Sequence, residues 1–218
     1  MIIVNFKAYS EVERDGALAL AKACEAVSEE TGVTISICPP TVDLSHVARS
    51  VSIPVLSQNV DPRAAGSATG WITPSMVKGC GAVGTLINHS EHKVPKSQIW
   101  ECVELSLGID LITVVCAENV QSAVQVAELT PDFIAVEPPE LIGGNVSVTT
   151  ENPLIIEETV EAVKAVHGSI SVLCGAGVKT GEDVKKAIEL GTSGVLLASG
   201  VVKANDPKAV LLDLVKYL

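Results

Sequence analysis

Aromatic residues and positive charges are scarce in this chain. Phe, Trp and Tyr make up 3% of its 218 residues although 47% are hydrophobic, so Val, Ile, Leu and Ala must build the core. Such small aliphatic residues favour closely packed parallel strands covered by helices. Because 15 Lys and Arg face 26 Asp and Glu, the formal net charge is −11. This charge argues against nucleic acid or an acidic membrane surface as a partner.

Clustered cysteines, a signal peptide and a membrane-length apolar run are also missing from the sequence. The six cysteines form no C-x-x-C pair and no Cys/His cluster, which predicts buried reduced thiols and no metal site. The chain opens directly on a strand-like run, and no apolar run is long enough to span a membrane. We therefore expect a cytoplasmic protein.

The chain does contain a regular alternation of apolar runs and amphipathic segments. Eight runs of strand length are Ile2–Phe6, Val33–Cys38, Pro54–Val60, Ala82–Asn88, Leu111–Cys116, Phe133–Glu137, Ile170–Cys174 and Val195–Ala198. The segments expected to be helical are Glu11–Thr31, Leu44–Ser50, Pro74–Lys78, Lys96–Leu107, Asn119–Leu129, Pro153–His167, Gly181–Leu190 and Pro207–Tyr217. No linker separates them, so we expect residues 1–218 to form a single domain.

This alternation predicts an α/β fold with parallel strands joined by right-handed crossovers. Eight strand–helix units are the number that closes a (β/α)8 barrel. A doubly wound open sheet is the alternative, but its first crossover would carry a Gly-rich turn, and the turn after Phe6 has no glycine. We therefore predict a single (β/α)8 barrel.

Chemistry in such a barrel takes place at the carboxyl ends of the strands. Glu137 ends the sixth run, where loss of water raises the pKa of a carboxylate and makes it a better base. Pro138 stiffens the exit from the strand, and Gly143 and Gly144 allow backbone angles that other residues resist. The residues between Pro138 and Gly143 could therefore swing as a lid. The simpler interpretation is an acid beside a surface loop.

Three further charged or titratable residues follow strand ends. Lys7 could hold an anion or a developing enolate, unless it is simply solvated. His89 precedes a candidate helix cap, Ser90, so a helix dipole would lower the pKa of its imidazole and keep it neutral. The alternative for His89 is a structural role in capping a loop. Glu91 could orient Lys7 through an ion pair or simply favour the start of a helix.

Small residues follow the seventh and eighth runs, at Gly175–Gly177 and Ala198–Gly200. They allow backbone N–H groups to approach a phosphate, and these two loops are the usual phosphate site of a barrel. The spacing of Gly175, Gly177 and Gly181 half-resembles a dinucleotide fingerprint, but it is wrong by one residue and lies late in the chain.

Four segments together fit one known pattern. They are Asn5-Phe6-Lys7, Asn88-His89-Ser90-Glu91, Ala135–Gly143 and Gly194–Gly200. They resemble the triosephosphate isomerase family of TIM barrels, and Glu-Pro-Pro-Glu-Leu-Ile-Gly and Leu-Leu-Ala-Ser-Gly are similar to its archaeal branch. The resemblance covers the whole chain. It implies interconversion of dihydroxyacetone phosphate and D-glyceraldehyde 3-phosphate through an enediol(ate), in glycolysis and gluconeogenesis, with no metal or organic cofactor.

The resemblance also implies a role for each candidate residue. Glu137 would move a proton between two carbons, and His89 would polarise the carbonyl and shuttle protons between the oxygens. Lys7 would balance the charge of the substrate, with Asn5 and Phe6 beside it. The backbone N–H groups that would bind the phosphate belong to Ile142, Gly143, Gly177, Ala198 and Ser199. Residues 138–145 would form a lid, and its closure over the substrate would exclude water.

Two places depart from the family pattern. His92-Lys93 stands where many relatives carry Arg, which affects the support of that loop. Trp71 replaces a usual Glu beside Gly66–Gly70, a loop that resembles the one reaching into a neighbouring subunit. The resemblance implies self-association as a homodimer or homotetramer, with Thr69 in the contact.

Two other functions remain open on the residues alone. A different phosphate-binding barrel enzyme would share only the seventh and eighth loops and would give His89 and Lys7 no role. A non-catalytic barrel could bind a sugar phosphate for regulation or assembly. The presence of all the proposed catalytic groups favours the isomerase.

Overall fold

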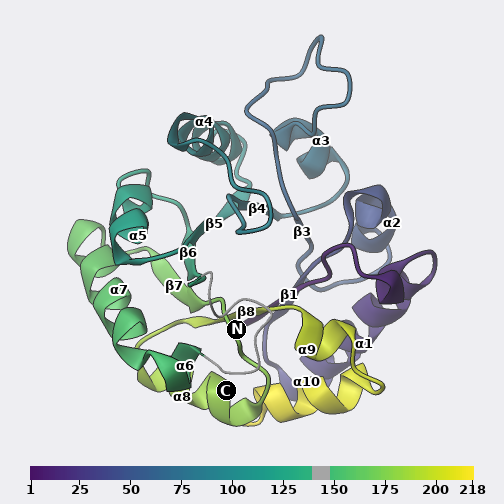
Figure 1. Ribbon diagram of the computed structural model, residues 1–218. Coiled ribbons are helices and arrows are strands. Elements are labelled where there is room, and N and C mark those ends of the chain that lie inside the picture. Colours follow the sequence, from purple (N-terminus) through teal and green to yellow (C-terminus); the bar gives the residue numbers. More distant parts are fainter. Residues whose placement is uncertain (139–147) are drawn as a thin grey trace.

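In the computed structural model, which describes residues 1–138 and 148–218, eight parallel strands form one sheet (Figure 1). Its order is β2-β1-β8-β7-β6-β5-β4-β3. The strands are β1 Ile2–Asn5, β2 Ile35–Cys38, β3 Leu56–Ser57, β4 Gly84–Ile87, β5 Ile112–Ala117, β6 Phe133–Val136, β7 Ser171–Cys174 and β8 Gly194–Leu197. All of them lie within the predicted runs or extend them by one residue.

The two outer strands of this order, β2 and β3, meet and nearly close the sheet. Ile37 on β2 forms an isolated parallel bridge with Val55, and its N–H group donates to the Pro54 carbonyl at 3.0 Å. The predicted (β/α)8 barrel is therefore confirmed. Strand β3 has two residues instead of the expected seven-residue run from Pro54, partly because Pro54 has no N–H to donate to a ladder.

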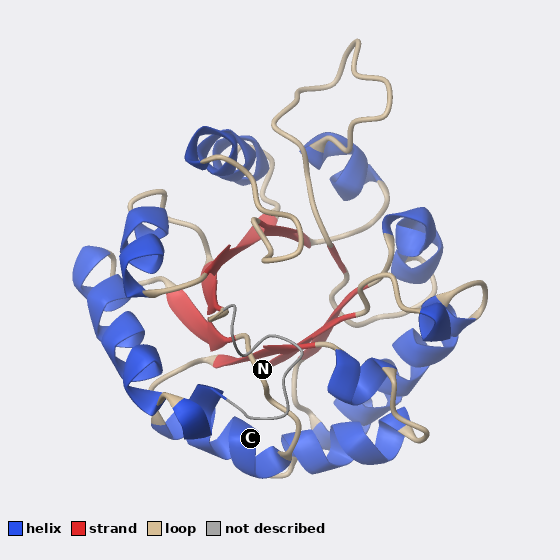
Figure 2. Cartoon of the chain, viewed as in Figure 1, coloured by secondary structure: helices blue, strands red, loops and turns tan. Residues whose placement is uncertain are grey.

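Helices surround the strands on the outside of the barrel (Figure 2). They are α1 Gly16–Thr31, α2 Leu44–Ala48, α3 Pro74–Gly79, α4 Lys96–Leu107, α5 Val120–Ala127, α6 Val148–Glu151, α7 Pro153–Val166, α8 Gly181–Glu189, α9 Ser199–Val202 and α10 Pro207–Val215. Helix α1 starts later than predicted, after a 3-10 turn at Ser10–Val12, and Arg14 between them has a left-handed backbone with φ of 56°. None of these described helices is long and apolar enough to cross a membrane.

Alternate residues of each strand face two different layers. Ile3 of β1 belongs to an inner cluster to which each of the eight strands contributes, including Leu86 and Leu196. Ile2 and Val4 instead pack in the layer between strands and helices. Because both faces are buried, the strands read as continuous apolar runs in the sequence. All six cysteines are free thiols and five are buried, as expected.

The connection between β3 and α3 projects away from the barrel (Figure 1). At its base, the Asp61 N–H group donates to the Ile72 carbonyl at 2.7 Å, and the Ile72 N–H group donates to Asp61 Oδ2 at 2.6 Å. The guanidinium of Arg63 stacks on the Trp71 ring, 4.7 Å from its centroid. These contacts close the base of the loop that carries Thr69.

Candidate active site

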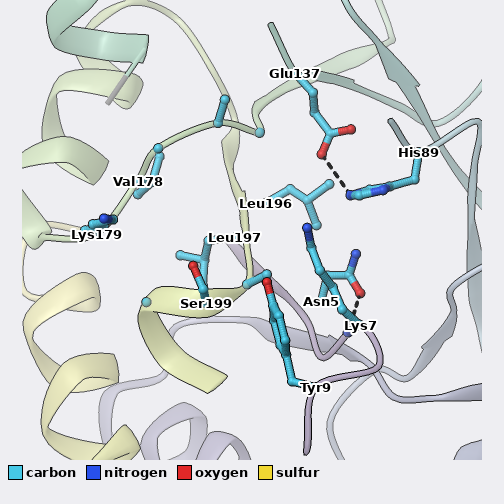
Figure 3. A pocket seen from close by; sticks show the side chains of 15 residues that line it. Asn5, Lys7, Tyr9, His89, Glu137, Val178, Lys179, Leu196, Leu197 and Ser199 are labelled. Atoms are coloured by element: carbon cyan, nitrogen blue, oxygen red, sulfur yellow. Dashed lines mark hydrogen bonds and ion pairs between the residues drawn. The ribbon is translucent and has the colours of Figure 1, made fainter. Parts of the chain in front are cut away.

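The carboxyl ends of five strands bring the predicted residues to one pocket, which we call the catalytic pocket (Figure 3). Its predicted members are Asn5, Lys7, His89, Glu137, Gly177, Ala198 and Ser199. Phe6 does not line it, because its side chain is fully buried in the hydrophobic core. A substrate contact by Phe6 therefore stays a prediction, and what the structure shows is a side chain packed in the core.

Glu137 lies directly after β6, and its side chain is deeply buried, with 3% of the residue exposed. Its N–H group donates to the Ala117 carbonyl at the end of β5, 2.8 Å away. Its Oε2 atom is buried without a hydrogen-bond partner among the described residues. Burial raises the pKa of this carboxyl to about 7, although the nearby Cys116 thiol and Lys7 cation offset part of the rise. Glu137 is thus matched to proton transfer near neutral pH.

His89 faces Glu137 across the pocket, with its Nε2 atom 3.4 Å from Glu137 Oε1 (Figure 3). The Glu91 N–H group donates to His89 Nδ1 at 3.1 Å, so a neutral imidazole carries its proton on Nε2. Burial, followed by the charge of Lys7, lowers the pKa of His89 to about 4. A neutral ring with Nε2–H directed into the pocket is suited to donate a hydrogen bond to a carbonyl oxygen.

The cause predicted for the lowered pKa of His89 is wrong, although the direction is right. No helix begins at Ser90, because the next one, α4, starts at Lys96. The loop after β4 is instead folded by Asn88, which has a φ of 60°. Asn88 donates through Nδ2 to the Cys116 carbonyl at 3.0 Å and accepts the Val94 N–H group at 3.1 Å. Desolvation, and not a helix dipole, therefore keeps the imidazole neutral.

Lys7 is held in place from several sides. Its backbone is left-handed, with φ of 51°, and its N–H group donates to Asn5 Oδ1 at 3.0 Å. Its ammonium forms the expected ion pair with Glu91, at 2.7 Å. Gln58, which the sequence pattern did not single out, donates through Nε2 to the Lys7 carbonyl at 2.9 Å and to the Cys38 carbonyl at 3.0 Å.

The loop that carries His92 and Lys93 is supported without the usual Arg. The His92 N–H group donates to the His89 carbonyl at 2.7 Å, which closes a turn around His89. Lys93 forms an ion pair with Glu118, a residue that follows β5. The departure from the family pattern therefore leaves the position of His89 intact.

The far end of the pocket is walled by small and apolar residues of the connections after β7 and β8, including Gly175, Gly177 and Ala198. Gly177 has φ of 71°, which a residue with a side chain rarely adopts. At Gly175 a Cβ atom would lie 2.6 Å from Glu137 Cγ and 3.0 Å from the Val136 carbonyl oxygen. The absence of a side chain at Gly175 thus makes room for the side chain of Glu137.

Some predictions fall outside the described residues. The phosphate contacts expected from Ile142 and Gly143, and most of the lid expected at residues 138–145, belong to residues 139–147. Tyr9 and Lys179 also line the pocket but were not predicted as site residues. Tyr9 lies four residues beyond the end of β1, where no strand-end pattern points to it. Gln58 directly follows β3, but the predicted run reaches Val60 and so places Gln58 inside a strand.

Comparisons with known proteins agree with this geometry. A profile of the triosephosphate isomerase family matches residues 1–218. The triosephosphate isomerase of Methanothermus fervidus is 49% identical over 215 residues, which cover 99% of this chain and 97% of that protein. The one from Methanobacterium bryantii is 49% identical over 218 residues, covering 100% and 96%. The crystal structure of triosephosphate isomerase from Bartonella henselae matches with a TM-score of 0.77 at 20% identity, covers 97% of both chains, and supports the fold.

Proposed function

The chain belongs to the triosephosphate isomerase family, and from this premise we propose that Glu137, His89 and Lys7 perform the chemistry of its reaction. That reaction interconverts dihydroxyacetone phosphate and D-glyceraldehyde 3-phosphate, a step of glycolysis. The observation that carries the proposal is the 3.4 Å approach of His89 Nε2 to Glu137 Oε1 at the mouth of the barrel. A substrate bound in the pocket that both residues line would meet a base and a hydrogen-bond donor together.

Glu137 is proposed as the base that removes a proton from one carbon and returns it to the neighbouring carbon. Its pKa of about 7 leaves a large fraction ionised at neutral pH and makes the carboxylate a stronger base than an exposed one. The proton that it carries stays on a buried oxygen, which limits exchange with water. An enediol(ate) is the species left between the two transfers.

His89 is proposed to stabilise that species as a neutral donor. Because its pKa is about 4, the ring holds one proton at neutral pH and can lend it to either substrate oxygen. A Glu base beside a neutral His is the arrangement already known for this enzyme family. Lys7 adds a positive charge where negative charge develops, and Asn5 fixes its backbone.

The phosphate of the substrate is proposed to bind at the glycine-rich end of the pocket. Backbone N–H groups of Gly177, Ala198 and Ser199 are the described candidates there, and Ile142 and Gly143 remain predictions. Small residues favour this use because they let the backbone come close to the phosphate oxygens. The charge of Lys7 offsets the net negative charge of the protein at the same place.

We also propose the wider organisation of the protein. The whole chain is a single domain, the protein is cytoplasmic, and it self-associates as a homodimer or homotetramer. The projecting loop that carries Thr69 supports self-association, because a closed base leaves an exposed tip for a second copy to bind. Trp71 stacks with Arg63 of the same loop, and this contact stabilises the base of the loop.

A coupled assay with D-glyceraldehyde 3-phosphate tests the proposed roles. We expect the purified protein to isomerise this substrate and the His89→Gln variant to lose about a hundredfold or more in kcat. Full isomerase activity of His89→Gln would contradict the proposed role of His89 as the hydrogen-bond donor. Binding of phosphoglycolate by the unsubstituted protein without any isomerisation would favour a non-catalytic sugar phosphate binder.

A further inference from the structure

Tyr9 lines the catalytic pocket although the mechanism above gives it no role. It follows Lys7 by two residues, is half-buried, and packs against the hydrophobic core. Figure 3 shows its side chain extended along the pocket wall, with the hydroxyl end directed toward the connection that carries Ser199. Within the part of the chain that the structure describes, this hydroxyl makes no hydrogen bond.

The surroundings of that hydroxyl are poor in side-chain donors. The wall after β7 and β8 consists largely of Gly175, Ala176, Gly177, Val178, Leu196, Leu197, Ala198 and Gly200, none of which carries a polar side chain. Among the described residues that line this end of the pocket, side-chain donors come from Ser199, Lys179 and Tyr9. A phosphate bound there has more acceptor oxygens than backbone N–H groups alone can satisfy, and a phenol O–H group is a suitable additional donor.

Lys203 holds the Tyr9 ring in this orientation. Its ammonium lies over the ring, 4.2 Å from the centroid, which is the geometry of a cation–π contact. Its N–H group donates to the Ser199 carbonyl at 3.1 Å, so Lys203 stands one turn beyond Ser199. The pair therefore connects the loop of Lys7 with the segment of Ser199, and both flank the proposed phosphate site.

We propose that Tyr9 is a specificity-determining residue of the triose phosphate site. Its hydroxyl donates a hydrogen bond to a phosphate oxygen of the substrate, and Lys203 is the positioning residue that fixes its ring. The proposal rests on the proposed function, because it takes the bound ligand to be a triose phosphate. It adds a side-chain contact to a phosphate site otherwise built from backbone groups and Lys7.

The first test compares Tyr9→Phe with Tyr217→Phe. The chain has two tyrosines, and Tyr217 also lies beneath a lysine, with Lys216 Nζ 4.9 Å from its ring centroid. Tyr217 does not line the pocket, so it is a matched control. We expect Tyr9→Phe to raise KM and the dissociation constant of phosphoglycolate about tenfold, with kcat within twofold, because the lost bond is to a charged group. Tyr217→Phe should change neither.

A substrate without phosphate separates binding of the phosphate from general damage. Isomerisation of D-glyceraldehyde, followed by NMR, should have the same kcat/KM in Tyr9→Phe as in the unsubstituted protein. Equal losses with and without the phosphate would assign Tyr9 to packing and overturn the proposal. Calorimetry with phosphoglycolate tests Tyr9 even if the protein isomerises nothing, so a failure of the proposed function is recognised separately.

A double-mutant cycle tests the part played by Lys203. We expect Lys203→Met to weaken phosphoglycolate binding about threefold, Lys203→Arg to restore it, and Lys203→Met to have no effect once Tyr9→Phe is present. An undiminished effect of Lys203→Met in the Tyr9→Phe background would contradict its positioning role. Unchanged binding of phosphoglycolate by Tyr9→Phe would overturn the proposal as a whole.

Discussion

At the scale of single residues, burial acts on Glu137 and His89 in opposite directions. Removing water disfavours the charged form of each group, so it raises the pKa of the carboxyl and lowers that of the imidazole. The carboxyl is thereby a stronger base, and the imidazole stays neutral. The ends of β4 and β6 bring the two side chains within 3.4 Å of each other and bury them. They therefore determine both the positions and the protonation states of Glu137 and His89.

The pH dependence of kcat/KM follows from these values. The free enzyme is active with Glu137 ionised and His89 neutral, so kcat/KM should fall about tenfold per unit as pH drops below about 7. Protonation of the His89 ring should lower kcat/KM further only near pH 4 and below. The substrate phosphate, whose second pKa is about 6, adds its own loss only below that pH. A profile that stays flat down to pH 5 would contradict the role of Glu137.

Gly175 provides a test of how closely Glu137 must be placed. The Cβ of Gly175→Ala would lie 2.6 Å from Glu137 Cγ, so the carboxylate must shift. We expect kcat to fall between tenfold and a hundredfold, since about 1 Å of misplacement can have that effect. Gly168→Ala is the control, because its Cβ would meet no atom within 4 Å. Equal activities of the two variants would show that the site tolerates this displacement.

The residues that could be predicted from the sequence share one property. Asn5, Lys7, His89 and Glu137 all lie at or just after the end of an apolar run, so the rule that strand ends carry chemistry finds them. Gln58 also follows a strand, β3, but the predicted run reaches Val60 and so places it inside the strand. Tyr9 lies four residues beyond the end of β1, too far for this rule to find it. The burial of His89 was also invisible, which is why its lowered pKa was assigned to a helix that does not exist.

At the scale of elements, the loop after β1 has a strained backbone at Lys7. Lys7 is left-handed and is fixed by bonds from Asn5 and Gln58 and by the ion pair with Glu91. A non-glycine residue keeps such a backbone only when its surroundings hold it. Gln58 is important here because it binds Lys7 and the end of β2 at once.

Replacement of Gln58 by the similarly sized Leu should loosen that loop. We expect Gln58→Leu to lower kcat/KM about tenfold, mainly through KM, because the Lys7 carbonyl loses its partner and the ammonium shifts. Steady-state kinetics measures this, with the exposed Gln125→Leu as control. If only the melting temperature falls while kinetics stay unchanged, Gln58 has a structural role alone.

Helices of five or more residues were predicted, although α1 begins five residues later than expected, and the four-residue helices were not. Helix α4 has the predicted bounds, Lys96–Leu107, because twelve residues display the helical period clearly. The four-residue helices α6 and α9 were missed, since one turn contains no repeat. The shortness of β3 depends on how the sheet closes, which is a property of the whole barrel.

At the scale of the whole molecule, the projecting loop between β3 and α3 bears on assembly. Its base is fixed by Asp61 and by the stack of Arg63 on Trp71, so Thr69 is presented on a defined structure. We expect Thr69→Arg to shift the protein toward smaller species in sedimentation velocity and to lower activity. Ser193→Arg, on the opposite end of the barrel before β8, serves as the control. A protein that sediments as a monomer before any substitution would refute the proposed self-association.

The barrel as a whole places its functional groups on different strands, so that no single segment contains the site. Glu137 is the centre of this arrangement, as the proposed base that moves the proton. The most direct test is the kcat of Glu137→Asp with D-glyceraldehyde 3-phosphate, because this change withdraws the carboxylate by one methylene and keeps its charge. We predict that kcat falls by about two to three orders of magnitude while KM changes less than about threefold. An unchanged kcat with a large rise in KM would contradict the assignment of Glu137 as the base.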